Sequence, residues 1–227
     1  MIYISHLDLS ASSPVFSAPD RDNRGRSVTR SPHHRASEGR RDPDATRGAL
    51  IDAARKEFEE SGFDSTQSNK IARRAGFAPQ TFYRHFIDKV DILLAVYACW
   101  VGEEQEALDA AKGMRKAARA LLEHHQASLK FRRALRALSV TDKRVRAARA
   151  NSRLLQIAHL RELVPHTSDV SDARLARSLF VIERVADACA EGEFADLRFG
   201  SDAAEEQLVD CLRQELALPS KTPKSRR

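Results

Sequence analysis

Gln80, Thr81 and Arg84 form a cluster of side chains that can bond to the edges of nucleic-acid bases. On a helix of about 100° per residue they share one face, and Phe82 and Phe86 lie on the opposite face. Arginine bonds to guanine, glutamine bonds to adenine, and a threonine methyl packs against the methyl of thymine. The pattern predicts a helix that is anchored by two aromatic rings and presents its polar face to the major groove.

Tyr83 and His85 flank this face, in positions from which side chains reach phosphate groups. Five basic residues and one acidic residue lie between Thr66 and Lys89, which gives this region a local net charge of +4. Acidic residues dominate 42–65, so the positive charge is local. A short aromatic-rich helix can also be ordinary core packing, and this alternative stays open here.

The segment before this helix has the apolar spacing of another helix. Leu50, Ile51, Ala54 and Phe58 recur with a helical period, and charged residues including Glu57 take the remaining positions. We therefore expect the first group to be buried and the charged residues to face solvent.

Two glycines and a proline divide the region into three helices. Gly62, followed by Phe63, is expected to end the first helix in a left-handed αL or Schellman turn. Thr66 is the expected N-cap of the second helix, and Gly76 breaks the chain again. Pro79 fits the first position of the third helix, where its missing N–H costs nothing. The order predicts a helix-turn-helix arrangement.

Residues 46–95 resemble the DNA-binding domain of the TetR family of bacterial transcription factors. The resemblance rests on three pieces of sequence: Gly62–Phe63, Ala75–Gly76, and Thr81–Phe82–Tyr83–Arg84–His85–Phe86. It implies phosphate contacts from Tyr83, His85 and Lys89, and a homodimer on a near-palindromic double-stranded operator. It also implies that Gln80 and Thr81 face bases or backbone. The candidate DNA-binding residues are Thr66, Gln67, Pro79, Gln80, Thr81, Tyr83, Arg84, His85 and Lys89.

Three positions depart from the pattern of that family. Ser68 stands at a normally apolar site, Asn69–Lys70 replaces a common basic–acidic pair, and Ala78 replaces the usual Ser or Thr cap. A missing side-chain cap at Ala78 is expected to cost about 1 kcal/mol of helix stability. We expect these departures to make the helices less stable without removing any of the main contacts with DNA.

Long amphipathic segments follow Lys89, and we expect helices near 89–111, 115–138, 141–163, 171–192 and 202–217. Apolar residues in 171–192 step by four and three, as in a coiled-coil seam. In the TetR family the last two helices of each subunit form a four-helix dimer interface. A seam buried within one subunit would have the same pattern. The candidate interface residues are Leu175, Leu179, Ile182, Ala186, Cys189, Leu208 and Leu212.

The resemblance also implies a ligand pocket among these helices. The side chains that combine aromatic and polar contacts are Tyr97, Trp100, His124, His125, Phe131, Gln156 and His159. Each of them alone is equally compatible with a core or surface position. Residues 112–149 hold twelve Lys and Arg against two acids, which favours an anionic effector or an approach to DNA, although solvated helix faces explain it as well. We expect the protein to be a repressor that a small molecule releases from its operator.

Composition predicts an all-α protein with two domains. Glycine and proline are few in the 227 residues, and no alternating Val/Ile/Thr runs occur. A net charge of +6 favours nucleic acid as a partner and, second, a membrane surface. We expect an Arg/Ser-rich disordered arm at 1–41, a helix-turn-helix domain at 42–90, a helical effector-binding and dimerisation domain at 91–218, and a basic disordered tail at 219–227. The arm could reach a minor groove, or be only a solvated tail.

Several classes of function are not expected. The three cysteines lack the spacing of a zinc site, and no nucleophile, phosphate loop or metal-spaced His/Cys group stands out, so we expect no enzyme activity, cofactor, metal or disulfide. No secretory signal is recognisable, and no apolar run reaches the roughly 18 residues of a membrane span. We expect a cytoplasmic protein, located at the nucleoid when it binds DNA. The alternatives are a helical ligand-binding or scaffold protein without operator binding and, less favoured by the sequence, an enzyme with an unrecognised site.

Overall fold

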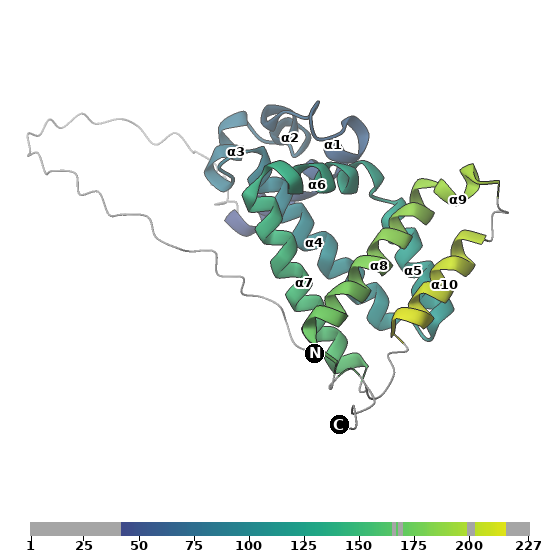
Figure 1. The fold of residues 1–227 in the computed structure, drawn as a ribbon. Helices are drawn as coiled ribbons and strands as arrows, with labels where there is room; N and C mark the ends of the chain where they lie inside the picture. The colour runs from purple at the N-terminus through teal and green to yellow at the C-terminus, as the bar shows by residue number, and fades with distance from the viewer. Residues whose placement is uncertain (1–41, 165–166, 168–169, 199–202, 217–227) are drawn as a thin grey trace, which may run out of the picture. The chain divides into compact units, whose positions relative to one another are not determined.

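All regular secondary structure among the described residues of the computed structural model, 42–164, 167, 170–198 and 203–216, is helical (Figure 1). The described residues belong to one compact unit. The expected all-α class is confirmed, and the predicted arm (1–41) and tail (219–227) lie outside the described residues. The helices are α1 (Pro43–Ser61), α2 (Ser68–Arg74), α3 (Pro79–His85), α4 (Lys89–Ala110), α5 (Met114–Gln126), α6 (Leu129–Thr141), α7 (Lys143–Leu163), α8 (Asp172–Glu191), α9 (Glu193–Asp196) and α10 (Ala203–Leu216).

Helix α1 begins and ends at residues that suit these positions. The Asp42 carboxylate accepts a hydrogen bond from the Asp44 N–H at 3.0 Å, and Pro43 takes the first turn. Gly62 ends the helix, but with φ 76° and ψ 163° it is not in the expected αL conformation. This backbone conformation is open essentially to glycine alone. It lets the chain turn back so that the Thr66 hydroxyl lies 2.7 Å from the Gly62 carbonyl oxygen.

Thr66 is not the N-cap of α2, as the sequence predicted. Its side chain is buried, and its hydroxyl also lies 3.2 Å from the carbonyl oxygen of Glu57. The cap position belongs to Gln67, which makes no side-chain capping bond. Thr66 instead closes the α1–α2 loop, because its hydroxyl donates to a carbonyl oxygen at the end of α1.

Helix α3 has the predicted start and the predicted anchor. Pro79 is its first residue, and Ala78 stands at the cap without a side-chain bond. Gly76, in the preceding turn, has φ 79°, a value that side chains with a Cβ rarely adopt. Phe82 and Phe86 are both buried, which confirms that the aromatic rings anchor α3.

The core beneath α1–α3 continues into the longer helices. Phe82 and Phe86 belong to the same apolar cluster as Ile92 on α4, Phe131 on α6 and Val145 on α7. In the view of Figure 1, α1, α2 and α3 lie together at the top with α6 directly below them. The expected division into domains at residue 90 therefore cuts through a shared core, and it stays a prediction.

The single helix predicted over 115–138 is two helices. It is interrupted at Ala127 and Ser128, between α5 and α6, where the sequence has neither glycine nor proline. Leu121 on α5 packs into the cluster formed with α8 and α10, whereas Phe131 and Leu135 on α6 pack into the core beneath α1. The break allows two apolar faces to reach different partners, which periodicity alone does not reveal.

The predicted dimer seam is intrachain core in the structure. Ile182, Ala186 and Cys189 on α8 pack with α5 and α10, and Leu175 packs against Ile157 on α7. Only Leu179 of the α8 candidates is partly exposed, and Leu208 and Leu212 on α10 are buried in the same chain. Side chains covered by their own subunit are not available to a partner. None of the described helices has the length and apolarity needed to cross a bilayer.

Candidate nucleic-acid interface and ligand cavity

The polar face of α3 is open to solvent. Gln80, Tyr83 and Arg84 are exposed, with 60% of the Tyr83 surface accessible, while Thr81 and His85 are partly buried. Within the described chain, Gln80 and Arg84 form no side-chain hydrogen bond or ion pair, so their donors and acceptors are free for a ligand. Because Phe82 fixes the opposite face in the core, the direction of these side chains is set by packing.

Glu57 is buried beneath α2, although the sequence placed it on the solvent face. Only 1% of its side chain is accessible, and its carboxylate pairs with Lys70 at 2.7 Å and with Arg74. Burial acts to raise the pKa of Glu57, but the hydrogen bonds from Lys70 and Arg74 outweigh it, so this pKa lies below its usual value. Lys70 and Arg74 follow Glu57 by thirteen and seventeen residues, so no pattern within a single helix predicts these ion pairs.

These ion pairs reduce the free positive charge near α3. Arg74 also pairs with Glu60, so two of the five basic residues counted there face acids of α1. Arg73 on α2 and Arg84 on α3 are exposed and have no ion-pair partner among the described residues. The charge available to an anionic polymer is therefore carried mainly by these two guanidinium groups.

Lys89 is turned toward the protein. Its Nζ atom donates to the carbonyl oxygens of Phe63 at 2.6 Å, Thr66 at 3.0 Å and Asp64 at 3.3 Å, and lies 4.2 Å from the centre of the Phe63 ring. An ammonium has three donors, and all three are occupied. Burial lowers the pKa of Lys89. In this arrangement Lys89 holds the α1–α2 loop and has no donor left for a phosphate.

The remaining candidates surround the start of α2 and α3. Gln67 is exposed at the cap of α2, Pro79 is partly buried at the start of α3, and Thr66 is buried in the loop between α1 and α2. Gln67 is thus placed where a backbone phosphate can approach a helix start. The side chain of Thr66 is not.

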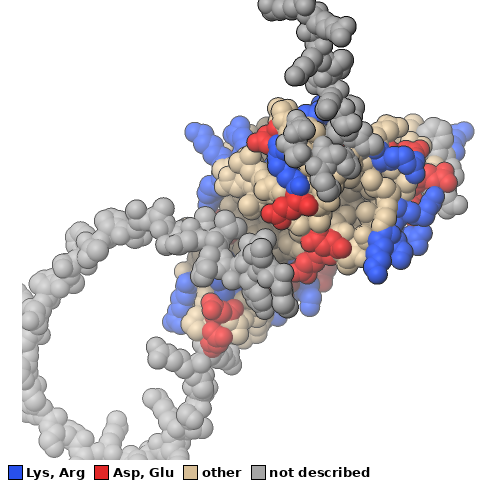
Figure 2. Space-filling view, turned by 90° about the horizontal axis from the view of Figure 1, so that it is seen from below, with Lys and Arg blue, Asp and Glu red and all other residues tan. Residues whose placement is uncertain are grey.

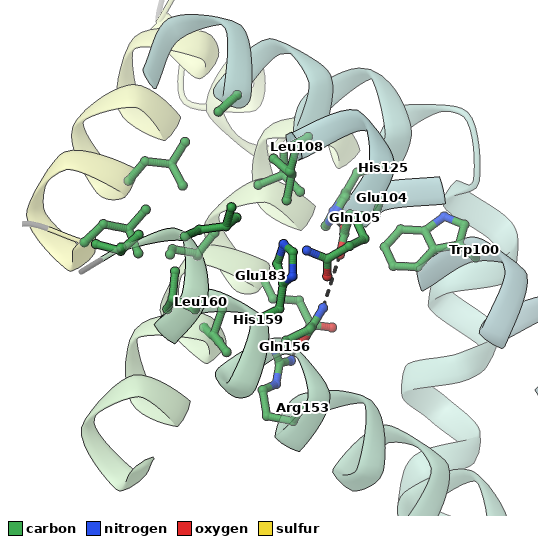
Figure 3. A pocket seen from close by; sticks show the side chains of 18 of the residues that line it. Trp100, Glu104, Gln105, Leu108, His125, Arg153, Gln156, His159, Leu160 and Glu183 are labelled. Atoms are coloured by element: carbon green, nitrogen blue, oxygen red, sulfur yellow. Dashed lines mark hydrogen bonds and ion pairs between the residues drawn. The ribbon is translucent and has the colours of Figure 1, made fainter. Parts of the chain in front are cut away.

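A cavity of about 210 Å³ lies among the helices that follow α3. Of the predicted pocket residues, Tyr97, Trp100, His125, Gln156 and His159 line it (Figure 3). His124 and Phe131 do not. The His124 ring stacks on Trp100 with centroids 4.4 Å apart, and Phe131 is buried in the core beneath α1.

The cavity has an apolar and a polar part. Figure 3 shows His125, Glu104, Gln105, Gln156 and His159 gathered on one side, with a dashed bond between Glu104 and Gln156. The apolar part consists mainly of leucines: Leu108, Leu121, Leu160, Leu163, Leu179, Leu212 and Leu216. Such a site suits a molecule with both an apolar and a polar portion.

An ion network lies behind the polar part. Arg132 donates to Asp187 at 2.7 Å and to Glu183 at 3.2 Å, and Glu183 also pairs with Arg149 at 2.9 Å and with Arg153. Burial acts to raise the pKa of Asp187, but hydrogen bonds from His125 and Arg132 hold it well below its usual value.

Sequence reasoning missed this network, although its spacing was visible. Its acids on α8, Glu183, Asp187 and Glu191, are four residues apart, as are Arg132 and Arg136 on α6 and Arg149 and Arg153 on α7. Residues four apart share a helix face, so the three rows could have been matched by charge. No group of three His, Cys, Asp or Glu side chains in the described parts of the chain is arranged to hold a metal ion.

Comparison with known proteins gives matches to bacterial regulators. Residues 50–96 match the family model of bacterial regulatory proteins of the tetR family. The fatty acid metabolism regulator protein of Bacillus subtilis (strain 168) is 37% identical over 60 residues, which are 26% of this chain and 31% of that protein. The regulator UidR of Escherichia coli (strain K12) is 37% identical over 51 residues, 22% of this chain and 26% of that protein. The chain thus spans less than a third of these relatives.

Solved structures are similar over a longer stretch. A protein from Rhodococcus sp. assigned to the TetR family of transcriptional regulators has a TM-score of 0.60 at 15% identity, covering 76% of this chain and 99% of that one. The fatty acid degradation regulator FadR of Bacillus halodurans has a TM-score of 0.52 at 17% identity, covering 74% and 94%. At such identities the likeness concerns the fold. Residues 50–96 are thus similar to bacterial regulatory proteins of the tetR family, and the described helices share the fold of these solved structures.

Proposed function

We propose that this protein is a sequence-specific DNA-binding transcriptional regulator that reads bases with α3. The observation that carries the proposal is the free, exposed face of Gln80 and Arg84 above the buried Phe82 and Phe86 rings. A rigid support and unpaired polar groups are what base recognition requires. Tyr83, His85 and Gln67 are placed to contact the flanking phosphates.

The distribution of charge supports one DNA-binding face. Arg73 and Arg84 are the exposed unpaired cations of α2 and α3. On the face turned away from α1–α3, which Figure 2 shows from below, Lys and Arg lie next to Asp and Glu. A surface of mixed sign attracts a polyanion less than a locally positive one.

The functional form is a homodimer on a near-palindromic operator. The outer side of α8 is available to a partner. Phe180 on this side has 58% of its surface exposed, and the exposed residues Arg177 and Arg184 lie on either side of Phe180 in the sequence. An exposed aromatic ring with flanking arginines is a typical anchor of a protein interface. Phe180→Glu should therefore convert a dimer into a monomer in sedimentation analysis. An unchanged sedimentation coefficient would show that the dimer interface does not include Phe180.

Control by a small molecule is part of the proposal. The cavity lies between α4, α5, α7, α8 and α10, and α4 also belongs to the core that supports α3. Occupancy of the cavity can therefore alter the seating of α4 and, through it, the spacing of two reading helices in a dimer. Half-sites about one helical turn apart tolerate little change in that spacing.

Selection from a pool of random DNA duplexes at two salt concentrations tests the proposal. We expect enrichment of one near-palindromic site, with binding that weakens steeply as salt rises. The control is a variant with Gln80 and Arg84 both changed to alanine, which should enrich no sequence while keeping its helical content. If the unaltered protein also enriches nothing, the chain is a helical ligand-binding or scaffold protein.

A further inference from the structure

The polar part of the cavity contains a buried donor that lacks an acceptor. Arg153 lines the cavity with 13% of its side chain exposed, and its Nε atom has no hydrogen-bond partner among the described residues. Its other nitrogens bond to Gln156 at 3.0 Å and to Glu183. Buried donors are nearly always satisfied in folded proteins, so this one indicates an acceptor that comes from outside the chain.

His125 joins two acids beside the cavity. Its Nδ1 lies 3.0 Å from Asp187 Oδ1, and its Nε2 lies 3.1 Å from Glu104 Oε1. Gln156 Nε2 donates to the other carboxylate oxygen of Glu104 at 3.3 Å. Both oxygens of Glu104 therefore have partners within the chain, whereas Arg153 Nε has none among the described residues.

Arginines outnumber the acids that they pair with in this network. Five arginines (132, 133, 136, 149 and 153) pair with three acids, Glu183, Asp187 and Glu191. Of these arginines, Arg132 and Arg153 line the cavity. A negatively charged group in the cavity would therefore lie next to guanidinium groups, and Arg153 has the donor that lacks an acceptor.

The size of the cavity and its apolar part limit the rest of the ligand. An engineered cavity of about 150 Å³ holds benzene, so 210 Å³ accommodates a molecule of roughly ten non-hydrogen atoms. Leu108 and Leu160 lie to one side of the polar cluster in Figure 3. A chain of several methylene groups can lie along this leucine wall while its head reaches Arg153.

We propose that the cavity binds a small amphiphilic carboxylate, with the carboxylate at Arg153 and the hydrocarbon chain along the leucine wall. The role of this molecule as the effector rests on the proposed function, but its binding does not. Gln156 lines the same part of the cavity; its amide donates one N–H to Glu104 at 3.3 Å and has a second N–H for the head of the ligand.

Trp100 provides a direct measurement because it is the single tryptophan of the chain and lines the cavity. Fluorescence titrations of the full-length protein would compare octanoate, octylammonium and octanol, which have the same chain and differ in the charge of the head. We expect a saturable change with octanoate at concentrations at least tenfold lower than with either of the others. Tighter binding of octylammonium would overturn the proposal and identify Glu104 as the anchor. Absence of any saturable change with octanoate would also overturn it.

Arg153→Gln and Arg153→Lys test the position of the head. Glu183 keeps Arg132 and Arg149 in both variants, so the network retains partners, and circular dichroism would check the fold. Loss of a charge-assisted bond should weaken octanoate binding about tenfold or more in Arg153→Gln, with Arg153→Lys recovering part of it and octanol binding unchanged. Arg119→Gln, at an exposed arginine on α5, is the matched control. Unchanged octanoate binding in Arg153→Gln would overturn the proposal.

The two proposals fail in different ways. Octanoate binding without an enriched DNA site would contradict the proposed function and leave the ligand assignment standing. An enriched DNA site together with no octanoate binding would contradict the ligand assignment alone.

Discussion

Replacing Lys89 by methionine separates two roles that this residue can have. The change keeps an apolar stem of similar length and removes the ammonium that bonds to the carbonyl oxygens of Phe63, Asp64 and Thr66. Two of these bonds are partly buried and one is exposed, so water can replace only the last of them readily. Each charge-assisted bond contributes about 1.5–3 kcal/mol, and the contact with the Phe63 ring adds about 0.5–1 kcal/mol. We expect the free energy of unfolding to fall by roughly 3 kcal/mol.

Urea unfolding followed by circular dichroism measures this change, with Lys56→Met on the exposed side of α1 as the control. The salt dependence of operator binding provides the second readout. A lysine that neutralises one phosphate contributes about 0.9 to the slope of log K against log salt. Because the donors of Lys89 are occupied, we expect an unchanged slope. A slope reduced by about 0.9 together with unchanged stability would refute this reasoning and favour the phosphate contact that the family resemblance implied.

Three further changes test the support of the site. Glu57→Gln should lower the free energy of unfolding at neutral pH by about 1–2 kcal/mol, because the two cations it leaves are partly solvated. Because the pKa of Glu57 is lowered in the folded state, its contribution to stability is complete above the unfolded pKa and is lost as the pH falls through the folded pKa. The difference in unfolding free energy between variant and parent should therefore narrow below about pH 4.5, and a constant difference would contradict this. Gly76→Ala, at φ 79°, should lower the free energy of unfolding by about 1–2 kcal/mol, whereas Gly48→Ala within α1 should be neutral or stabilising. Equal effects of the two changes in thermal melts would rule out backbone strain at Gly76. Ile182→Ala should cost about 2–5 kcal/mol of stability at every protein concentration, whereas dissociation of a dimer without loss of monomer stability would return the α8 seam to the interface.

The sequence predicts the DNA-binding helices well because their determinants are local. The period of Leu50 and Phe58, the breaks at Gly62 and Gly76, and Pro79 at the start of α3 each act within one or two turns. Short-range rules of this kind need no knowledge of the tertiary partners.

The features that were missed depend on contacts between distant segments. The break at Ala127 exists because α5 and α6 pack into different clusters. Glu57 can be buried because Lys70 and Arg74, which belong to another helix, pair with its carboxylate. The Thr66 hydroxyl donates to a carbonyl oxygen at the end of α1, and Thr66 does not occupy the cap of α2. The α8 seam has the same period whether it faces its own chain or a partner, so only the packing of α10 decides which it does.

A comparison of Arg84→Ala with Arg73→Ala tests base reading by α3 most directly. Both arginines are exposed and unpaired within the described chain, but only Arg84 lies on α3. Binding to the selected operator and to each of its single-base variants would be measured at one salt concentration. We predict that Arg84→Ala loses about 1–3 kcal/mol of discrimination at one base pair per half-site, while Arg73→Ala weakens binding to all sequences alike. A uniform loss in Arg84→Ala, with its base preferences intact, would contradict the claim that α3 reads the operator.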